Sequence, residues 1–258
     1  MTFEVRSQIA LVWWSILFIL VYAFSMIFLW QMVPPPPAGW SSEQVKTWYL
    51  ERDTSIKLGA TVASWTAAFL VPLFIVLGIQ IGRHERGYPV WSIVAIVSGA
   101  LTSIFLALPP IFFGTAAFAP ERAADATAML HQLGVLTFFT TDQFYIFGWI
   151  ALGVVSLKAP VAKHSPFPRW YGYYSLWLAT LFEAGALAFL FKSGPFAWRG
   201  LFVFYIPLIT FASWLILTSC LLLSALKKQL QEADASDAPV EVQSGAHDLL
   251  APDDHLAH

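Results

Sequence analysis

Six long apolar segments constrain this sequence more than any other feature. Each is long enough for the roughly 20 residues that a bilayer-crossing helix needs. The first is about twice as long as the h-region of a signal peptide and lacks an A-x-A-like cleavage site, so we expect a retained helix. The predicted fold class is an all-α integral membrane protein, a bundle of six transmembrane helices. We place the spans near residues 9–32, 58–82, 90–118, 129–157, 170–191 and 200–226.

The composition agrees with a membrane location. Hydrophobic residues make up 58% of the chain and charged residues only 12%, about half the usual share of a soluble domain. A mean hydropathy of +0.66 leaves too few polar groups to cover a soluble fold. We therefore expect the lipid bilayer as the first partner. The single cysteine, Cys220, excludes an intrachain disulfide and a thiolate metal cluster within one chain.

The charges divide the chain into two parts. Seven of the sixteen acidic residues follow Lys228, so the remaining part carries 14 basic and 9 acidic residues. This mild basic excess lacks the dense basic stripe of a nucleic-acid binder, and we expect no nucleic-acid partner. Residues 229–258 are rich in Ala, Asp, Gln and Ser, which predicts a disordered acidic tail behind a transmembrane domain over residues 1–228.

Lysine and arginine in the short loops predict the orientation. With six spans, both termini share one side, which carries eight basic residues against six on the other. Because basic loops favour the cytoplasm, we expect both termini to be cytoplasmic and the protein to lie in the cell membrane, inner or plasma. The eight are Arg6, Arg83, Arg86, Lys158, Lys163, Arg169, Lys227 and Lys228, and the six are Lys46, Arg52, Lys57, Arg122, Lys192 and Arg199.

The outer loop between spans one and two predicts a short helix. It follows a proline run, Pro34 to Pro37, and Ser41 and Gln44 have the spacing of a capping box. Trp48 and Tyr49 then continue at helical spacing. We expect an amphipathic helix that lies at the outer interface.

Cofactor chemistry has little support in the sequence. Membrane di-iron enzymes need clustered histidines, whereas the part before the tail has only His84, His131 and His164. A buried haem needs two facing axial ligands, and only His131 lies near a span. P-loop, G-x-G-x-x-G and H-E-x-x-H motifs are also missing from the sequence. We therefore expect no cofactor and no metal site.

Two carboxyl groups inside the spans are the strongest functional signal. Asp142 lies in the middle of span four and Glu183 in the outer half of span five. A charge at the bilayer centre costs at least about 2.5–3.5 kcal/mol, so such residues normally face the bundle interior. Consecutive spans pack as antiparallel neighbours, and we expect Asp142 and Glu183 to share one site. At least one should then carry a proton at neutral pH.

Span four supplies further candidate ligand-binding residues. His131 lies eleven residues before Asp142, or three helical turns plus about 20°, so both project from nearly the same face. Gln143 and Tyr145 add to the polar lining of a cavity that opens outward. Together with Asp142 and Glu183, these residues predict an intrabundle cavity that binds or transports a lipophilic small molecule.

Two other readings stay open. In the first, the protein is a cofactor-free membrane isomerase or cyclase, in which Asp142 and Glu183 are the catalytic acid and base. In the second, it is an accessory subunit of a larger membrane complex, and the buried polar groups only fix helix registry. The spacing Gly78-x-x-x-Gly82 permits close helix approach and leaves a homo-oligomer open.

Several local patterns carry a resemblance to a known family. They are the stretch Lys192-Ser193-Gly194-Pro195-Phe196-Ala197-Trp198-Arg199-Gly200, the Phe118-Ala119-Pro120-Glu121-Arg122 loop and the Phe167-Pro168-Arg169-Trp170 start of span five. With these features, residues from about 9 to 228 resemble a family of bacterial six-span integral membrane proteins without an established activity. The resemblance implies the six-span fold and transfers no catalytic residues.

Overall fold

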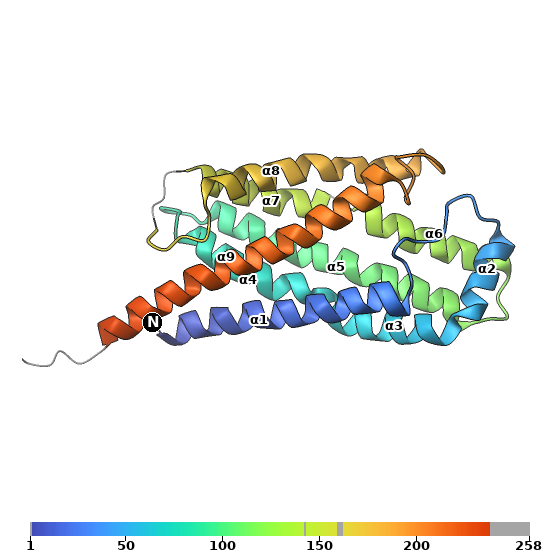
Figure 1. The fold of residues 1–258 in the computed structure, drawn as a ribbon, viewed down its shortest axis with the longest axis horizontal. Coiled ribbons are helices and arrows are strands. Elements are labelled where there is room, and N and C mark those ends of the chain that lie inside the picture. Colours follow the sequence, from blue (N-terminus) through green and yellow to red (C-terminus); the bar gives the residue numbers. More distant parts are fainter. Residues whose placement is uncertain (1, 142, 159–161, 238–258) are drawn as a thin grey trace, which may run out of the picture.

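The fold is a long helical bundle. The computed structural model describes residues 2–141, 143–158 and 162–237, and every regular element in this part of the chain is helical. The start of α1 and the end of α9 lie at one end of the bundle, here called the terminal end, and α2 lies at the opposite end, here called the α2 end (Figure 1). The sequence prediction of an all-α bundle is confirmed at this level.

Nine α-helices and four shorter segments follow one another along the described chain. The helices are α1 (Thr2–Phe24), α2 (Ser42–Glu51), α3 (Asp53–Thr66), α4 (Leu70–Gly82), α5 (Val90–Phe118), α6 (Ala124–Thr140), α7 (Gln143–Leu157), α8 (Arg169–Phe182) and α9 (Ile206–Asp237). The π-helical segments are η1 (Ser25–Leu29) and η4 (Leu201–Tyr205), and the 3₁₀ segments are η2 (Ala67–Phe69) and η3 (Glu183–Phe189).

Five helical stretches of the described chain are long and apolar enough to cross a membrane. They are Thr2–Leu29, Asp53–Gly82, Val90–Phe118, Ala124–Leu157 and Leu201–Ser236. Each overlaps one of the predicted spans. The remaining predicted span, 170–191, corresponds to α8 and η3, which are not among the five, so the count of six stays a prediction.

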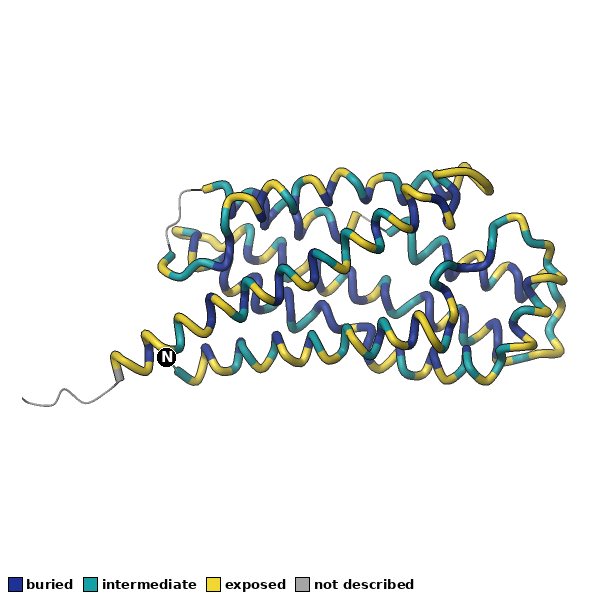
Figure 2. The backbone as a smooth tube through the Cα atoms, in the orientation of Figure 1, coloured by how far each residue is buried: buried dark blue, intermediate teal, exposed yellow. Residues whose placement is uncertain are grey.

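The surface of the bundle suits a bilayer. Buried residues line the inner faces of the helices, and exposed residues alternate with them on the outside (Figure 2). Many exposed side chains are large and apolar, for example Trp65 on α3 and Ile209 on α9. Exposed apolar surface on this scale is unusual for a soluble monomer. It supports contact between these helices and lipid.

The α2 helix begins as its sequence predicts. The Ser41 hydroxyl accepts a hydrogen bond from the Gln44 backbone N–H (3.3 Å), and the Gln44 side chain accepts one from the Ser41 backbone N–H (2.9 Å). The predicted capping box is therefore confirmed. Val45 and Tyr49 are buried, which fixes α2 against the end of the bundle.

The fourth predicted span departs from regular helical geometry at Thr141. Continuous apolar sequence predicts one helix over 129–157, but α6 ends at Thr140 and Thr141 has the non-helical φ and ψ values of −100° and 27°. The hydroxyls of Thr140 and Thr141 donate to the carbonyls of Leu136 and Thr137. Such bonds compete with the helical pattern and can bend a helix. The next helix, α7, begins at Gln143.

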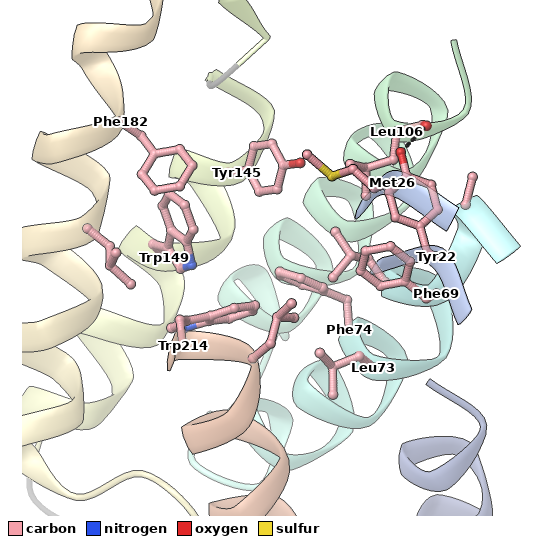
Figure 3. Packing of buried hydrophobic residues seen from close by; sticks show 14 of the residues in the cluster. Tyr22, Met26, Phe69, Leu73, Phe74, Leu106, Tyr145, Trp149, Phe182 and Trp214 are labelled. Carbon is pink, nitrogen blue, oxygen red and sulfur yellow. Dashed lines mark hydrogen bonds between the residues drawn. The ribbon is translucent and has the colours of Figure 1, made fainter. Parts of the chain in front are cut away.

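Aromatic rings fill the middle of the bundle (Figure 3). Trp149 on α7 and Trp214 on α9 are fully buried, with ring centroids 5.9 Å apart. Phe74 on α4 lies 5.8 Å from Trp214. Large rigid rings therefore pack α4, α7 and α9 together in the middle of the bundle.

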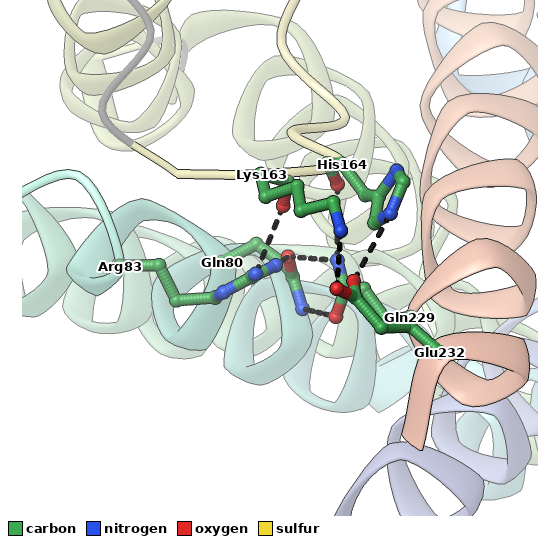
Figure 4. Close-up of polar contacts among 6 residues, drawn as sticks. All are labelled: Gln80, Arg83, Lys163, His164, Gln229 and Glu232. Atoms are coloured by element: carbon green, nitrogen blue, oxygen red, sulfur yellow. Dashed lines mark hydrogen bonds and ion pairs between the residues drawn. The ribbon is translucent and has the colours of Figure 1, made fainter. Parts of the chain in front are cut away.

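Polar contacts hold the terminal end together (Figure 4). The Gln80 side-chain carbonyl on α4 accepts hydrogen bonds from Arg83 (2.8 Å) and from Gln229 on α9 (3.0 Å). The Gln80 amide donates to Gln8 on α1 (2.8 Å). Three helices are thus tied to one buried amide.

The α9 helix extends beyond the predicted end of the domain. It continues past Lys228 to Asp237, whereas the sequence predicts a disordered tail from residue 229. Glu232 contacts both Lys163 and His164, the latter at 3.1 Å between Nε2 and Oε2. Asp234 lies 3.7 Å from Arg6 of α1. These contacts join the end of α9 to α1 and to the segment before α8. The rest of the predicted tail, 238–258, lies outside the described residues.

Candidate functional site

An apolar cavity lies between α1 and α9. Its volume is about 310 Å³, and its walls also include η1, η2, α5, α6, α7, α8, η3 and η4. The two framing helices meet at the terminal end and separate toward the α2 end (Figure 1). The cavity occupies this separation.

The cavity opens on the outer surface of the bundle, between α1 and α9. Leu20 of α1 and Ile216 of α9 both line the cavity, and they are 63% and 64% exposed. Side chains that border a cavity and the outer surface at once mark its opening.

The cavity wall is almost entirely apolar. Tyr22 and Tyr145 are the only described lining residues with a polar side chain. The Tyr22 hydroxyl donates to the Leu106 carbonyl (2.8 Å). The Tyr145 hydroxyl points toward Met26 (Figure 3). The remaining surface offers aliphatic and phenyl groups, which suit a lipophilic molecule.

One side of α1 is anchored by hydrogen bonds to other helices. Ser15 donates to the Phe69 carbonyl (2.6 Å), and Ser25 donates to the Gly59 carbonyl (2.8 Å). With Tyr22, these residues fix α1 and the adjoining η1 to the α3, η2 and α5 side of the bundle. The lining residues of α9 are apolar, so the boundary between α1 and α9 along the cavity depends on packing.

Local sequence explains the shape of the α9 wall. Pro207 has no backbone N–H and cannot complete a regular α-helical turn. The π-helical segment η4 ends directly before this region and supplies Val203 and Phe204 to the wall. A second π-helical segment, η1, supplies Met26. Single π-helical turns are frequent at functional sites.

Of the predicted site residues that the structure describes, Tyr145 lies at the cavity and His131, Gln143 and Glu183 lie elsewhere. Tyr145 lines the cavity. His131 is buried near the α2 end. Gln143 and Glu183 are exposed and are not among the lining residues. Asp142 lies outside the described residues, so the predicted pairing of Asp142 with Glu183 stays a prediction.

His131 has an aromatic environment. Its Nδ1 lies 3.1 Å from the Tyr49 hydroxyl, which joins α6 to α2. Ring centroids of Tyr49, Phe113 and Trp198 lie 5.8, 6.0 and 6.1 Å from the imidazole. Trp48 lies 6.3 Å away. Burial raises the pKa of Tyr49 well above its usual value, so this hydroxyl keeps its proton.

Tyr22 is a cavity residue that was not predicted, although the sequence carries a signal for it. The first apolar segment contains the polar residues Ser15, Tyr22 and Ser25 at spacings of seven and three. These spacings place them on one helical face. All three donate hydrogen bonds to other helices, so this face marks the buried side of α1.

Comparisons with known proteins give no relative for this chain: no family model, no curated protein and no solved structure matches it. The resemblance to a six-span bacterial family therefore stays a prediction.

Proposed function

We propose that this membrane protein binds a lipophilic small molecule in the cavity between α1 and α9 and admits it sideways from the bilayer. The carrying observation is an apolar cavity of about 310 Å³ with Leu20 and Ile216 at its lipid-facing mouth. This volume lies at the lower end of the usual range for small-molecule sites.

Selectivity would come from shape. A ligand that leaves lipid for the cavity exchanges one apolar environment for another, so the gain depends on close packing. Phe139, Phe182 and Phe211 supply rigid walls for such packing. A flat or slender molecule fits this kind of wall best. The same site could serve binding alone or one step of passage through the membrane.

Binding has better support than the isomerase or cyclase alternative. An acid and a base would both have to reach the cavity, and the Glu183 carboxyl is exposed on η3 and is not a lining group. The accessory-subunit alternative gains no specific observation.

A substitution at the mouth tests the proposal. Ala212 lines the cavity and is exposed on α9, so Ala212→Phe should occupy the opening. Full-length protein in phosphatidylcholine nanodiscs would be irradiated with dodecanol that carries a diazirine at the chain end, and labelled peptides would be mapped by mass spectrometry. We expect labelling of α1 and α9 around the cavity, reduced about tenfold by Ala212→Phe, which is a loss of about 1.4 kcal/mol in binding.

A matched variant controls for the added ring. Ala100 on α5 is also exposed but does not line the cavity, so Ala100→Phe should leave labelling unchanged. Equal labelling of wild type and Ala212→Phe would contradict the proposed site, as would labels spread evenly over all lipid-facing helices.

A further inference from the structure

One face of α6 runs from the cavity to a buried histidine. His131, Val135, Phe138 and Phe139 follow one another at spacings of four, three and one residues. These positions fall on the same side of a helix. Phe138 and Phe139 line the cavity. His131 lies seven residues before Phe138, about 10.5 Å along the axis at 1.5 Å per residue.

A second, smaller space continues the cavity along this face. It has a volume of about 10 Å³ and shares Met26, Phe138 and Phe139 with the cavity. Val135 and Phe113 also line it. The Met26 side chain is flexible, as methionine side chains generally are, so its movement would join the two spaces.

His131 lies beyond the small space, behind the Phe113 ring, and does not line it; one of its ring nitrogens is unused. The residue is 1% exposed, and the Phe113 ring that borders the small space lies 6.0 Å from the imidazole. Nδ1 contacts the Tyr49 hydroxyl, whereas Nε2 has no hydrogen-bond partner among the described residues. A buried polar atom is destabilising without a partner. The site therefore favours a ligand that brings one.

From these observations we propose that the ligand is an amphiphile with a single uncharged polar head group, which hydrogen-bonds to Nε2 of His131 while its apolar body lies in the cavity. This inference rests on the proposed function. The class includes long-chain and polycyclic alcohols and ketones.

The surroundings of His131 define the head group. Four aromatic rings enclose the imidazole, and no described charged side chain hydrogen-bonds to it. A charged head group would be desolvated there without a counter-ion. A hydroxyl can donate or accept. It therefore pairs with Nε2 whether Nε2 or Nδ1 carries the proton.

A pair of probes that differ by one hydroxyl tests this inference. Dodecanol and dodecane would each compete with the photoactivatable dodecanol in nanodiscs that hold the full chain, at matched mole fractions in the bilayer. We expect dodecanol to compete about tenfold better than dodecane in wild type. With dodecane bound, Nε2 of His131 stays without a hydrogen-bond partner, and a difference of this size is usual for one buried hydrogen bond. His131→Phe should reduce this preference to near one, and His131→Gln should retain part of it.

His84 provides the matched control. It is also buried, with one ring nitrogen bonded to Ser165 (2.9 Å) and the other unpartnered among the described residues, but it lies at the terminal end. His84→Phe should keep the full preference for dodecanol. Equal competition by both probes in wild type, or an unchanged preference in His131→Phe, would overturn the inference and leave the proposed cavity standing.

A measurement on the wild-type protein tests the same inference if His131→Phe does not fold. Dodecanol with the diazirine beside the hydroxyl should label α6 around His131 and α2 around Tyr49. Labels at the terminal end instead would overturn the head-group site. If neither probe competes and no cavity peptide is labelled, the proposed function itself fails.

Discussion

At the scale of single residues, the polar groups that matter in this bundle are those with partners on other helices. Tyr22, Ser15 and Ser25 each donate to a backbone carbonyl of another helix, and Tyr49 contacts His131. Residue type and depth predicted a role for His131 and Tyr145. They did not indicate Tyr22, because the carbonyl that accepts its hydrogen bond lies more than eighty positions away in the sequence.

Close packing at Gly99 gives a residue-scale prediction. A Cβ at this position would lie 2.3 Å from Cβ of Phe74, which packs against Trp214. Gly99→Ala should therefore destabilise the fold by about 1–3 kcal/mol, as overpacking usually does. Reversible unfolding in detergent would measure the change. Gly82→Ala is the control, because its added Cβ would make only an ordinary contact at 3.6 Å with Ser92. An equal loss in both variants would contradict the packing argument.

At the scale of elements, helix ends are where local sequence is most informative. The α2 capping box follows directly from Ser41 and Gln44. The spacing of Gly78 and Gly82, in contrast, left a homo-oligomer open, whereas the structure uses it within the chain. Ser92 of α5 donates to the Gly78 carbonyl (2.7 Å), and Ile96 covers Gly78. A small-residue motif indicates that another helix packs closely against it, but it does not indicate which helix this is.

Loss of the capping box gives an element-scale prediction. Ser41→Ala should cost about 1 kcal/mol of α2 stability, the usual value for an N-cap. Because α2 carries Tyr49, the loss should appear as faster amide hydrogen exchange over Ser42–Glu51. Ser42→Ala removes a neighbouring hydroxyl outside the capping box, and exchange should stay near wild type. Unchanged exchange in Ser41→Ala would show that tertiary packing alone holds α2.

At the scale of the whole molecule, the bundle has one end held by polar contacts and one side held by packing. Gln8, Gln80 and Gln229 join α1, α4 and α9 at the terminal end. The cavity opens farther along, where α1 and α9 separate. This arrangement suits a lateral opening that widens at the mouth while the terminal end stays fixed.

Cross-linking gives the whole-molecule prediction. In a Cys220→Ser background, Leu20→Cys and Ile216→Cys joined by a short bis-maleimide should close the mouth and abolish labelling by the diazirine probe. The control joins Arg6→Cys to Asp234→Cys at the terminal end, where the native side chains lie 3.7 Å apart. Labelling should persist there. Entry that survives closure of the mouth would contradict lateral access.

The sequence by itself determined the all-helical class, the positions of the long apolar helices and the start of α2. These features depend on local hydrophobicity and on contacts within one turn, which neighbouring residues specify. Only the tertiary structure decided that Glu183 is exposed, that Gln229 and Glu232 of α9 contact Gln80 and His164, and that Tyr22 and Tyr145 share a cavity wall. Those outcomes depend on which helix faces meet, and that choice is made by packing between segments far apart in the chain.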